Sequence, residues 1–194
     1  MFRSFAIAAT LVVSAAFTAQ AQTQDGGSGS ATDLPLGQPA QQQPPQVETL
    51  ATHGDWDVRC VTTPNGKRGC QLFQLLKEAS GNPVAEASIF AAPQGQANVV
   101  AGGSIMTPLE TLLPRNLAFA IDGGEAKTYP YVFCTVKGCQ ARLGFSAIEL
   151  AALEKGTTAT VTIYSVRAPQ EPVVITMSLA GFTAAYDDML AKSN

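Results

Sequence analysis

The sequence predicts a mainly β domain: an antiparallel β-sandwich or barrel-like fold with one short helix near residues 146–155 and two hairpin disulfides. Two observations lead to this class. Short apolar runs with period-two alternation recur between turn signals from residue 56 onward, which is typical of antiparallel strands. Strands and helical segments do not alternate along the chain, so a doubly wound parallel sheet is not expected.

The first 21 residues have the pattern of an export signal. Arg3 precedes an uncharged apolar run from Phe5 to Phe17, and the A-x-A pattern at residues 19–21 predicts cleavage after Ala21. The alternative is a retained membrane anchor, which needs about 20 apolar residues. We therefore expect an exported protein, periplasmic, on the outer surface or secreted, with no transmembrane segment after signal cleavage.

A polar segment follows the predicted signal. Residues 22–48 are rich in Gln, Pro, Gly and Ser and cannot bury enough apolar surface to offset their ordering entropy. They predict a disordered tether; a binding motif is the alternative. The folded domain is then expected to cover residues 49–194, a size that can hold one full core.

The charge excludes some partners. The full chain of 194 residues has a formal net charge of −3, and removal of Arg3 with the signal would make it about −4. No basic patch or basic helix stands out, so nucleic acid and anionic membrane surfaces are poor partners.

The first predicted hairpin contains two cysteines. Trp56, Val58 and Cys60 alternate on one strand, and Cys70 lies on the return strand after a Pro-Asn-Gly loop at 64–66. Counting outward from this loop places Cys60 opposite Cys70, at a Cα distance of about 4.5 to 5.5 Å that a disulfide can span. Trp56 is expected in the core rather than on a ligand platform.

A second hairpin follows the same plan. A four-residue loop from Thr135 to Gly138 makes Cys134 and Cys139 opposed partners. An even cysteine count in an oxidising compartment favours two disulfides. Local geometry favours pairing within each hairpin. The alternative, in which each early cysteine pairs with a late one across two sheets, stays open at this point.

The other elements follow in order. Alternation and turn signals predict further strands at 84–91, 97–106, 117–121, 125–136, 157–166 and 173–179. The glycines at 102 and 103 indicate a bulge or a close backbone approach. Pro130 indicates an edge position or a bulge. The tail from residue 181 is expected to be a loop or short helix that packs Phe182 and Tyr186 on the end of the sandwich.

The helix at 146–155 is predicted from its ends. Ser146 and Glu149 form a capping box, and Gly156 suits the left-handed position after the last turn. Ile148, with the alanines at 151 and 152, is expected to face the core.

One aromatic stripe is a candidate binding surface. Tyr129, Tyr131 and Phe133 are spaced to share one face of the strand that Pro130 marks as an edge, and Val132 and Cys134 are spaced for the other. The alternative is that the stripe belongs to the core.

The sequence contains no recognisable catalytic or metal-binding pattern. His53 is the only histidine and is interpreted as a boundary residue rather than a catalytic base. The spacing of Cys60 and Cys70 does not fit a zinc site. Asp55 and Asp57 are expected to point to solvent, as are the tail residues Asp187 and Asp188. We therefore expect no catalytic residue, metal or cofactor, and no enzyme. A periplasmic hydrolase with an unrecognised site and a thiol–disulfide role are the alternatives.

Several short sequence motifs occur in a fixed order along the predicted domain. The chain contains GDWDVRC at 54–60, C-Q-L-F-Q at 70–74, a DGG turn at 122–124, Y-x-F-C-x-x-x-G-C at 131–139 and L-x-G-F-x-x-A-Y-D at 179–187. Together they resemble the invasion-associated locus B family of alphaproteobacteria, over nearly the whole predicted domain.

The resemblance implies an exported, β-rich envelope protein. The family is named after a member linked to host-cell invasion, and it supplies no catalytic residues to transfer. What transfers is the cysteine framework at 60, 70, 134 and 139, with the aromatic residues Trp56, Phe182 and Tyr186, all interpreted as structural. The expected function is non-enzymatic binding or structural support in the envelope, with a protein or another envelope component as partner.

Overall fold

The computed structural model describes residues 46–193 apart from residues 79 and 94. The predicted signal peptide at 1–21 and most of the predicted tether therefore lie outside the described residues. The first strand begins at Val47, so residues 47 and 48 belong to the fold rather than to the tether.

Strands dominate the described part of the chain. The strands are β1 (Val47–His53), β2 (Trp56–Thr62), β3 (Arg68–Lys77), β4 (Pro83–Ala91), β5 (Ala101–Thr107), β6 (Leu117–Ile121), β7 (Lys127–Tyr129), β8 (Tyr131–Thr135), β9 (Gly138–Phe145), β10 (Thr158–Ser165) and β11 (Ala168–Ser178). The helices are α1 (Ala147–Lys155) and α2 (Phe182–Lys192), with a 3₁₀ turn at Leu113–Arg115. The mainly β class is confirmed, but the described residues contain a second helix where a loop or short helix was expected.

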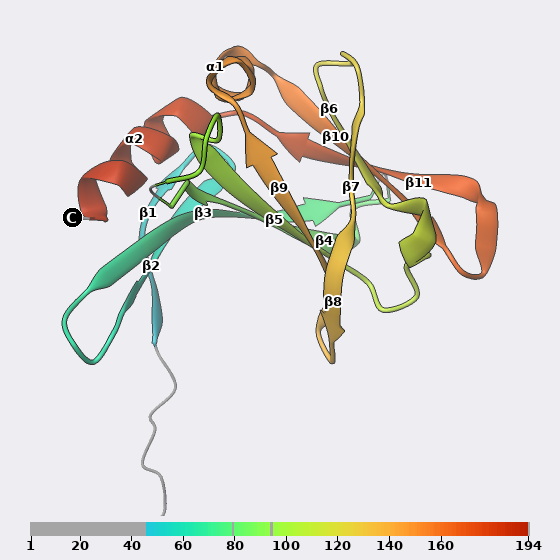
Figure 1. Cartoon of the computed structure of the whole chain (residues 1–194), viewed down its shortest axis with the longest axis horizontal. Coiled ribbons are helices and arrows are strands. Elements are labelled where there is room, and N and C mark those ends of the chain that lie inside the picture. The colour runs from blue at the N-terminus through green and yellow to red at the C-terminus, as the bar shows by residue number, and fades with distance from the viewer. Residues whose placement is uncertain (1–45, 79, 94, 194) are drawn as a thin grey trace, which may run out of the picture. The chain divides into compact units, whose positions relative to one another are not determined.

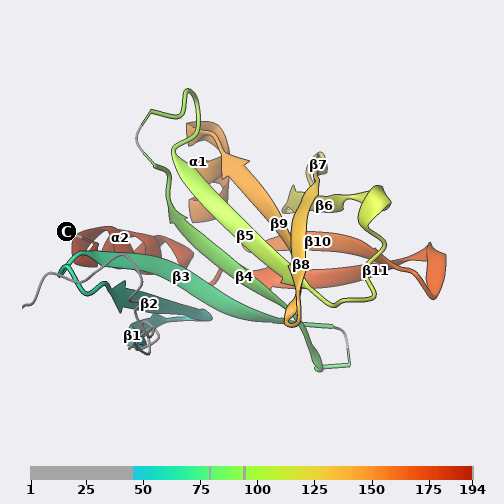
Figure 2. The same ribbon diagram turned by 60° about the horizontal axis from the view of Figure 1, so that its bottom comes forward.

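The strands form one antiparallel sheet in the order β7-β6-β10-β11-β3-β4-β5-β9-β8, with β1 and β2 branching from β3. The branch arises because β3 is long: Phe73 pairs with Asp57 of β2, whereas Lys77 pairs with Thr176 of β11. The sheet bends into a sandwich-like arrangement and is not closed by hydrogen bonds (Figure 1, Figure 2). The strands at its two ends, β7 and β8, are neighbours in sequence through Pro130.

Pro130 therefore divides the single strand predicted at 125–136. Its first part, β7, pairs with β6, and its second part, β8, pairs with β9. Proline has no backbone N–H to donate to a ladder, which explains why the chain changes partner there.

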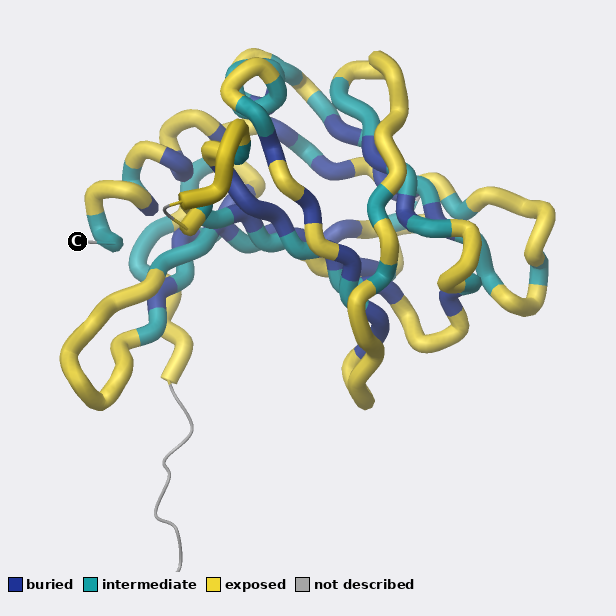
Figure 3. The backbone as a smooth tube through the Cα atoms, viewed as in Figure 1, coloured by how far each residue is buried: buried dark blue, intermediate teal, exposed yellow. Residues whose placement is uncertain are grey.

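Buried residues lie along the strands of the bent sheet (Figure 3), and their side chains form one core cluster. Alternate residues of β2, β3, β4, β9, β10 and β11 are buried there, as the period-two patterns predicted. Trp56 is fully buried and donates its indole N–H to the Ser178 carbonyl oxygen at 3.0 Å. The prediction that Trp56 belongs to the core is confirmed.

Helix α2 packs over β1, β2 and β3. Phe182 meets Trp56 edge-on, with ring centroids 5.3 Å apart, and stacks on Tyr186 at 5.9 Å. These aromatic contacts add to the area that the rings bury. Phe182 and Tyr186 therefore pack as expected, from a helix longer than expected.

Two glycines let the ends of the domain meet. Gly54 has φ +57 and Gly181 has φ +83, a left-handed conformation that glycine adopts most readily. A Cβ on Gly181 would lie 2.2 Å from the His53 carbonyl oxygen, and one on Gly54 would lie 2.4 Å from the Ala180 oxygen. The opening and closing sequence motifs thus cross in direct backbone contact.

Helix α1 confirms its predicted start and corrects two other expectations. The Ser146–Glu149 capping box is present. Ile148 is 83% exposed, and the helix buries Leu153 instead, because its inward side is one position off the predicted face. Gly156 has φ −73, not a left-handed value. A Cβ there would lie 2.8 Å from the Ala152 carbonyl oxygen, a backbone atom, so close packing requires this glycine.

Candidate functional site: a hollow on the outer face of the sheet

The cysteines pair within each hairpin. Cys60 pairs with Cys70 and Cys134 with Cys139, with Cα atoms 4.1 and 4.0 Å apart, and none of the four is free. The local pairing is confirmed and the cross-sheet alternative is wrong. Both pairs are directly opposed in their ladders, so the hairpin turns alone bring the thiols together.

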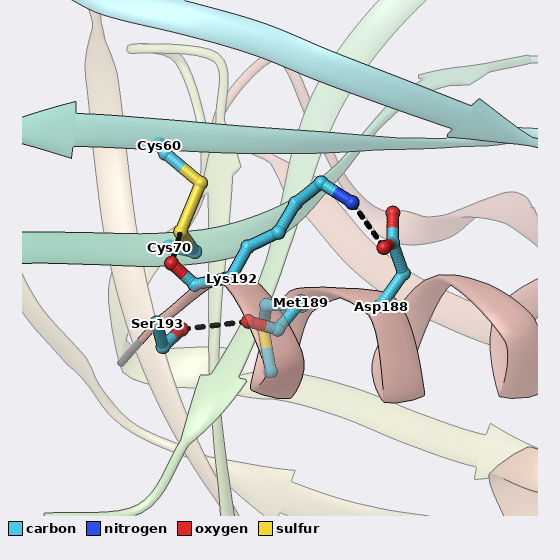
Figure 4. Close-up of a disulfide and its surroundings, with 6 residues drawn as sticks. All are labelled: Cys60, Cys70, Asp188, Met189, Lys192 and Ser193. Atoms are coloured by element: carbon cyan, nitrogen blue, oxygen red, sulfur yellow. Dashed lines mark hydrogen bonds and ion pairs between the residues drawn. A yellow bond between two sulfur atoms is a disulfide. The ribbon is translucent and has the colours of Figure 1, made fainter.

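The first disulfide lies beside the C-terminal end of α2 (Figure 4). Cys70 Sγ is 3.4 Å from the Lys192 carbonyl oxygen, a contact without a donated proton because the sulfur is oxidised. Met189, one turn earlier in α2, is fully buried. This disulfide is therefore part of the core packing.

The aromatic stripe predicted as a binding surface does not share one face. Tyr129 is opposite the buried Leu117, and Tyr131 is opposite the buried Ala141, so both face inward and pack on the core. A bulge follows Tyr131, and Phe133 pairs with Gln140 instead. An extra residue in one strand reverses the side to which the next residue points. Phe133 is therefore on the outer side and 43% exposed.

Tyr131 carries an unusual buried group. Its hydroxyl oxygen is buried and has no hydrogen-bond partner among the described residues. Burial raises the pKa of this phenol, and the neighbouring Thr107 side chain offsets part of the shift. A role of the three aromatic residues in binding stays a prediction.

Three other residues considered for chemistry, His53, Asp57 and Asp188, form ion pairs. His53 Nε2 lies 3.0 Å from Asp188 Oδ2, and Lys192 pairs with the other oxygen of this carboxylate, Oδ1, so Asp188 is not a solvated tail residue. Lys192, and to a lesser degree His53, lower the pKa of the Asp188 carboxyl. Asp57 pairs with Arg59 at 2.9 Å. In the described residues, no group of three or more His, Cys, Asp or Glu side chains has the arrangement of a metal site.

One hollow in the described part of the chain lies on the outer face of β3, β4, β5 and β9, away from the core. Its volume is about 670 Å³, within the range of small-molecule sites. The three strands β4, β5 and β9 lie side by side there (Figure 2). Pro93 and Val99 of the β4–β5 connection line the hollow as well.

The ladder register sets the floor of this hollow in rows across β4, β5 and β9. The rows are Phe90–Gly102–Gly144, Ser88–Ser104–Arg142 and Glu86–Met106–Gln140. Gln140 donates its side-chain amide to the Ser104 hydroxyl. Glu86 and Arg142 have no ion-pair partner among the described residues. The floor therefore offers hydroxyl and amide groups and one charge of each sign.

The Phe90 ring lies over a glycine of the neighbouring strand. A Cβ on Gly102 would lie 2.3 Å from Phe90 Cε2 and 2.9 Å from its Cζ, so the ring occupies the space that a side chain at position 102 would fill. The sequence predicts a bulge or a close backbone approach at the glycines at 102 and 103. The ladder is regular at both positions, and the close neighbours are side-chain rings rather than another backbone: Phe90 at Gly102 and Phe145 at Gly103.

Sequence reasoning missed the hollow. The residues that line it alternate with the core residues of three strands, and this alternation can be seen in the sequence. The sequence does not show that β5 pairs with the distant strand β9, so the rows of side chains across the floor cannot be derived from it.

No helix in the described part of the chain is long and apolar enough to cross a membrane.

The sequence and the fold are both similar to those of known proteins. Two curated relatives, invasion protein B homologues of Brucella abortus strain 2308 and of Brucella abortus biovar 1 strain 9-941, are each 29% identical over 141 residues, 72% of this chain and 78% of theirs. The crystal structure of invasion associated protein B from Bartonella henselae shares the fold, with a TM-score of 0.61 and 21% identity over 75% of this chain and 96% of that one. Residues 56–190 match the family described as Invasion associated locus B (IalB) protein. The chain belongs to the invasion associated locus B family.

Proposed function

We propose that this protein is exported to the cell envelope and acts there as a non-enzymatic binding protein, contributing to host-cell interaction or invasion. The export-signal pattern at residues 1–21 supports the location. The names of the Brucella and Bartonella relatives support the link to invasion, and the family is named after invasion rather than a reaction. The proposed partner is a protein or another component of the envelope.

The observation that carries the binding proposal is the hollow on the outer face. Its floor consists of strands that are hydrogen-bonded on both sides, so the lining side chains stand on a rigid support. Binding to a pre-formed site avoids much of the entropy cost of ordering. Its lining mixes apolar and polar side chains, as ligand sites commonly do.

Crosslinking from within the hollow tests this use of the surface. A photoreactive phenylalanine analogue replaces Met106, which lies on the middle strand of the floor. The matched control places the same analogue at Val174 on β11, which is 55% exposed and does not line the hollow. We expect irradiation of intact cells to give a discrete adduct from position 106 only. Equal labelling from both positions, or none from position 106, contradicts the proposal.

Export has a separate test. Residues 1–48 are fused to alkaline phosphatase, which is active only after export, and the control fusion begins at residue 22. Activity is expected from the first fusion alone. Equal activity from both would contradict export by the predicted signal.

A further inference from the structure

We propose that the hollow binds a neutral saccharide, with Phe90 as the surface on which a sugar ring stacks. The inference rests on the proposed function, since it names the ligand class for the same surface. Four features of the floor carry it: the backbone of its middle strand is already paired, the polar side chains match hydroxyl groups, Phe90 supplies an aromatic ring, and the charges cancel.

The middle strand of the floor offers a ligand no free edge. Strand β5 pairs along its length with β4 and with β9, whereas the β3–β4 ladder ends at Ile89 and the β8–β9 ladder ends at Ala141. An extended peptide that binds by adding a strand needs a free edge. A ligand that lies over β5 must instead form its hydrogen bonds with side chains.

The polar side chains of the floor both donate and accept. Serine hydroxyls and glutamine amides do so, and the hollow contains Ser88, Ser104, Gln71 and Gln140. Sugar hydroxyls have the same dual character, so each can pair with such a group in either direction. The bond from Gln140 to Ser104 holds two of these groups in place, which reduces the ordering cost of binding.

Phe90 supplies the apolar part of the contact. Because the glycine beneath it has no side chain, the ring lies on the strand and lines the hollow. The face of an aromatic ring carries partial negative charge, and the C–H groups on one side of a sugar ring carry partial positive charge. A sugar ring lying parallel to Phe90 thus packs its C–H side on the ring and directs its hydroxyls to the neighbouring rows.

The charges favour a neutral ligand. Glu86 and Arg142 are one acid and one base on different strands of the floor, with a net charge of zero. A strongly anionic or cationic ligand would be attracted by one and repelled by the other. Hydroxyl groups can donate to Glu86 and accept from Arg142.

Amide-resolved NMR titration of the protein tests the ligand class. The probes are trimers of glucose, mannose and N-acetylglucosamine, with trialanine as the peptide probe. We expect at least one saccharide to shift the amide signals of Ser88, Gly102 and Arg142 saturably, and trialanine to leave them unchanged. Phe90→Ala should weaken that binding about tenfold or more.

A glycine pair provides the matched control. Gly102→Ala displaces the Phe90 ring but keeps every polar group, and it should also weaken saccharide binding about tenfold. Gly69→Ala adds the same methyl group on β3, where no atom lies within 4 Å, and should bind as the unaltered protein does. Thermal unfolding of both variants checks that each is folded.

Three results would overturn the saccharide assignment: no trimer shifts the floor signals, the shifts map to another surface, or Phe90→Ala and Gly102→Ala bind as well as Gly69→Ala. If trialanine alone saturates the floor, the ligand class is wrong but the binding function stands. An adduct from position 106 without saccharide binding would likewise show that the ligand class is wrong and that the binding function stands. Absence of both the adduct and saccharide binding contradicts both proposals.

Discussion

The two disulfide hairpins, β2–β3 and β8–β9, share one plan but differ in their surroundings. In both, directly opposed cysteines close a turn, over a sequence separation of 10 in the first and 5 in the second. Cys60 is 3% exposed, and its hairpin is covered by α2. Cys139 is buried, but Cys134 is exposed on an end strand that pairs only with β9. The same local device thus supports the core in one place and holds a projecting edge in the other.

The largest effect is expected from removing the α2 contact on the first hairpin. Phe182→Ala deletes a fully buried ring that packs on Trp56 and Tyr186, and should lower the free energy of unfolding by about 3 to 5 kcal/mol. Urea denaturation measures this change. Leu190→Ala is the control. Leu190 lies on the same helix but is 39% exposed, so this variant should lower the free energy of unfolding much less. Similar losses would mean that α2 does not depend on its aromatic contacts.

The next effect is expected from opening the first disulfide. Replacing both Cys60 and Cys70 with serine removes the cross-link and buries a polar hydroxyl where Cys60 lies. The expected loss is about 3 kcal/mol from the cross-link alone, and more with the desolvated hydroxyl. The urea midpoint under non-reducing conditions measures it.

Opening the second disulfide should lower the free energy of unfolding by less than opening the first. Replacing Cys134 and Cys139 with serine releases a shorter loop, for which the loop-entropy model gives about 2 kcal/mol. Each double variant buries one serine hydroxyl, at position 60 or at position 139, so the difference between the two variants comes from the loop length. Urea denaturation beside the first double variant makes the comparison direct. An equal or larger loss here would contradict the distinction between a core disulfide and an edge disulfide.

The smallest effect concerns acid sensitivity beside the first hairpin. Lys192 and His53 lower the pKa of Asp188 in the folded protein. The ion pairs therefore stabilise the fold fully above the carboxyl's unfolded pKa of about 3.9, and this stability is lost as the pH falls through the lowered folded value. Asp188→Asn should lower the urea midpoint at pH 6, and the difference should shrink toward pH 2. A difference that is constant with pH would exclude the carboxylate as its cause.

Local features of the fold were predictable from the sequence because they depend on neighbouring residues. The cysteine register follows from turn length, and the α1 start follows from Ser146 and Glu149. Helix α2 was underestimated because Gly181 is a weak start signal and makes no side-chain cap. Its buried Phe182, Ala185, Tyr186 and Met189 have the i, i+3, i+4, i+7 spacing that indicates a helix.

The features that were not predictable depend on long-range pairing. The bulge after Tyr131 arises where β8 meets β9, and it moves Phe133 to the outer face. Strand β1, which pairs with β2, lies partly in sequence that reads as a tether. The candidate site can be located only when the register between β4, β5 and β9 is known. Period-two alternation shows which side chains share a face of a strand, but it does not show which strands pair.

The crossing of Gly54 and Gly181 has a consequence for how the chain folds. The contact closes a loop of nearly the whole domain, and such closure is entropically costly and slow. Phe182 cannot pack on Trp56 until α2 has been synthesised. A chain truncated before residue 181 should therefore stay open and aggregation-prone, and the core should be completed only after α2 has left the ribosome.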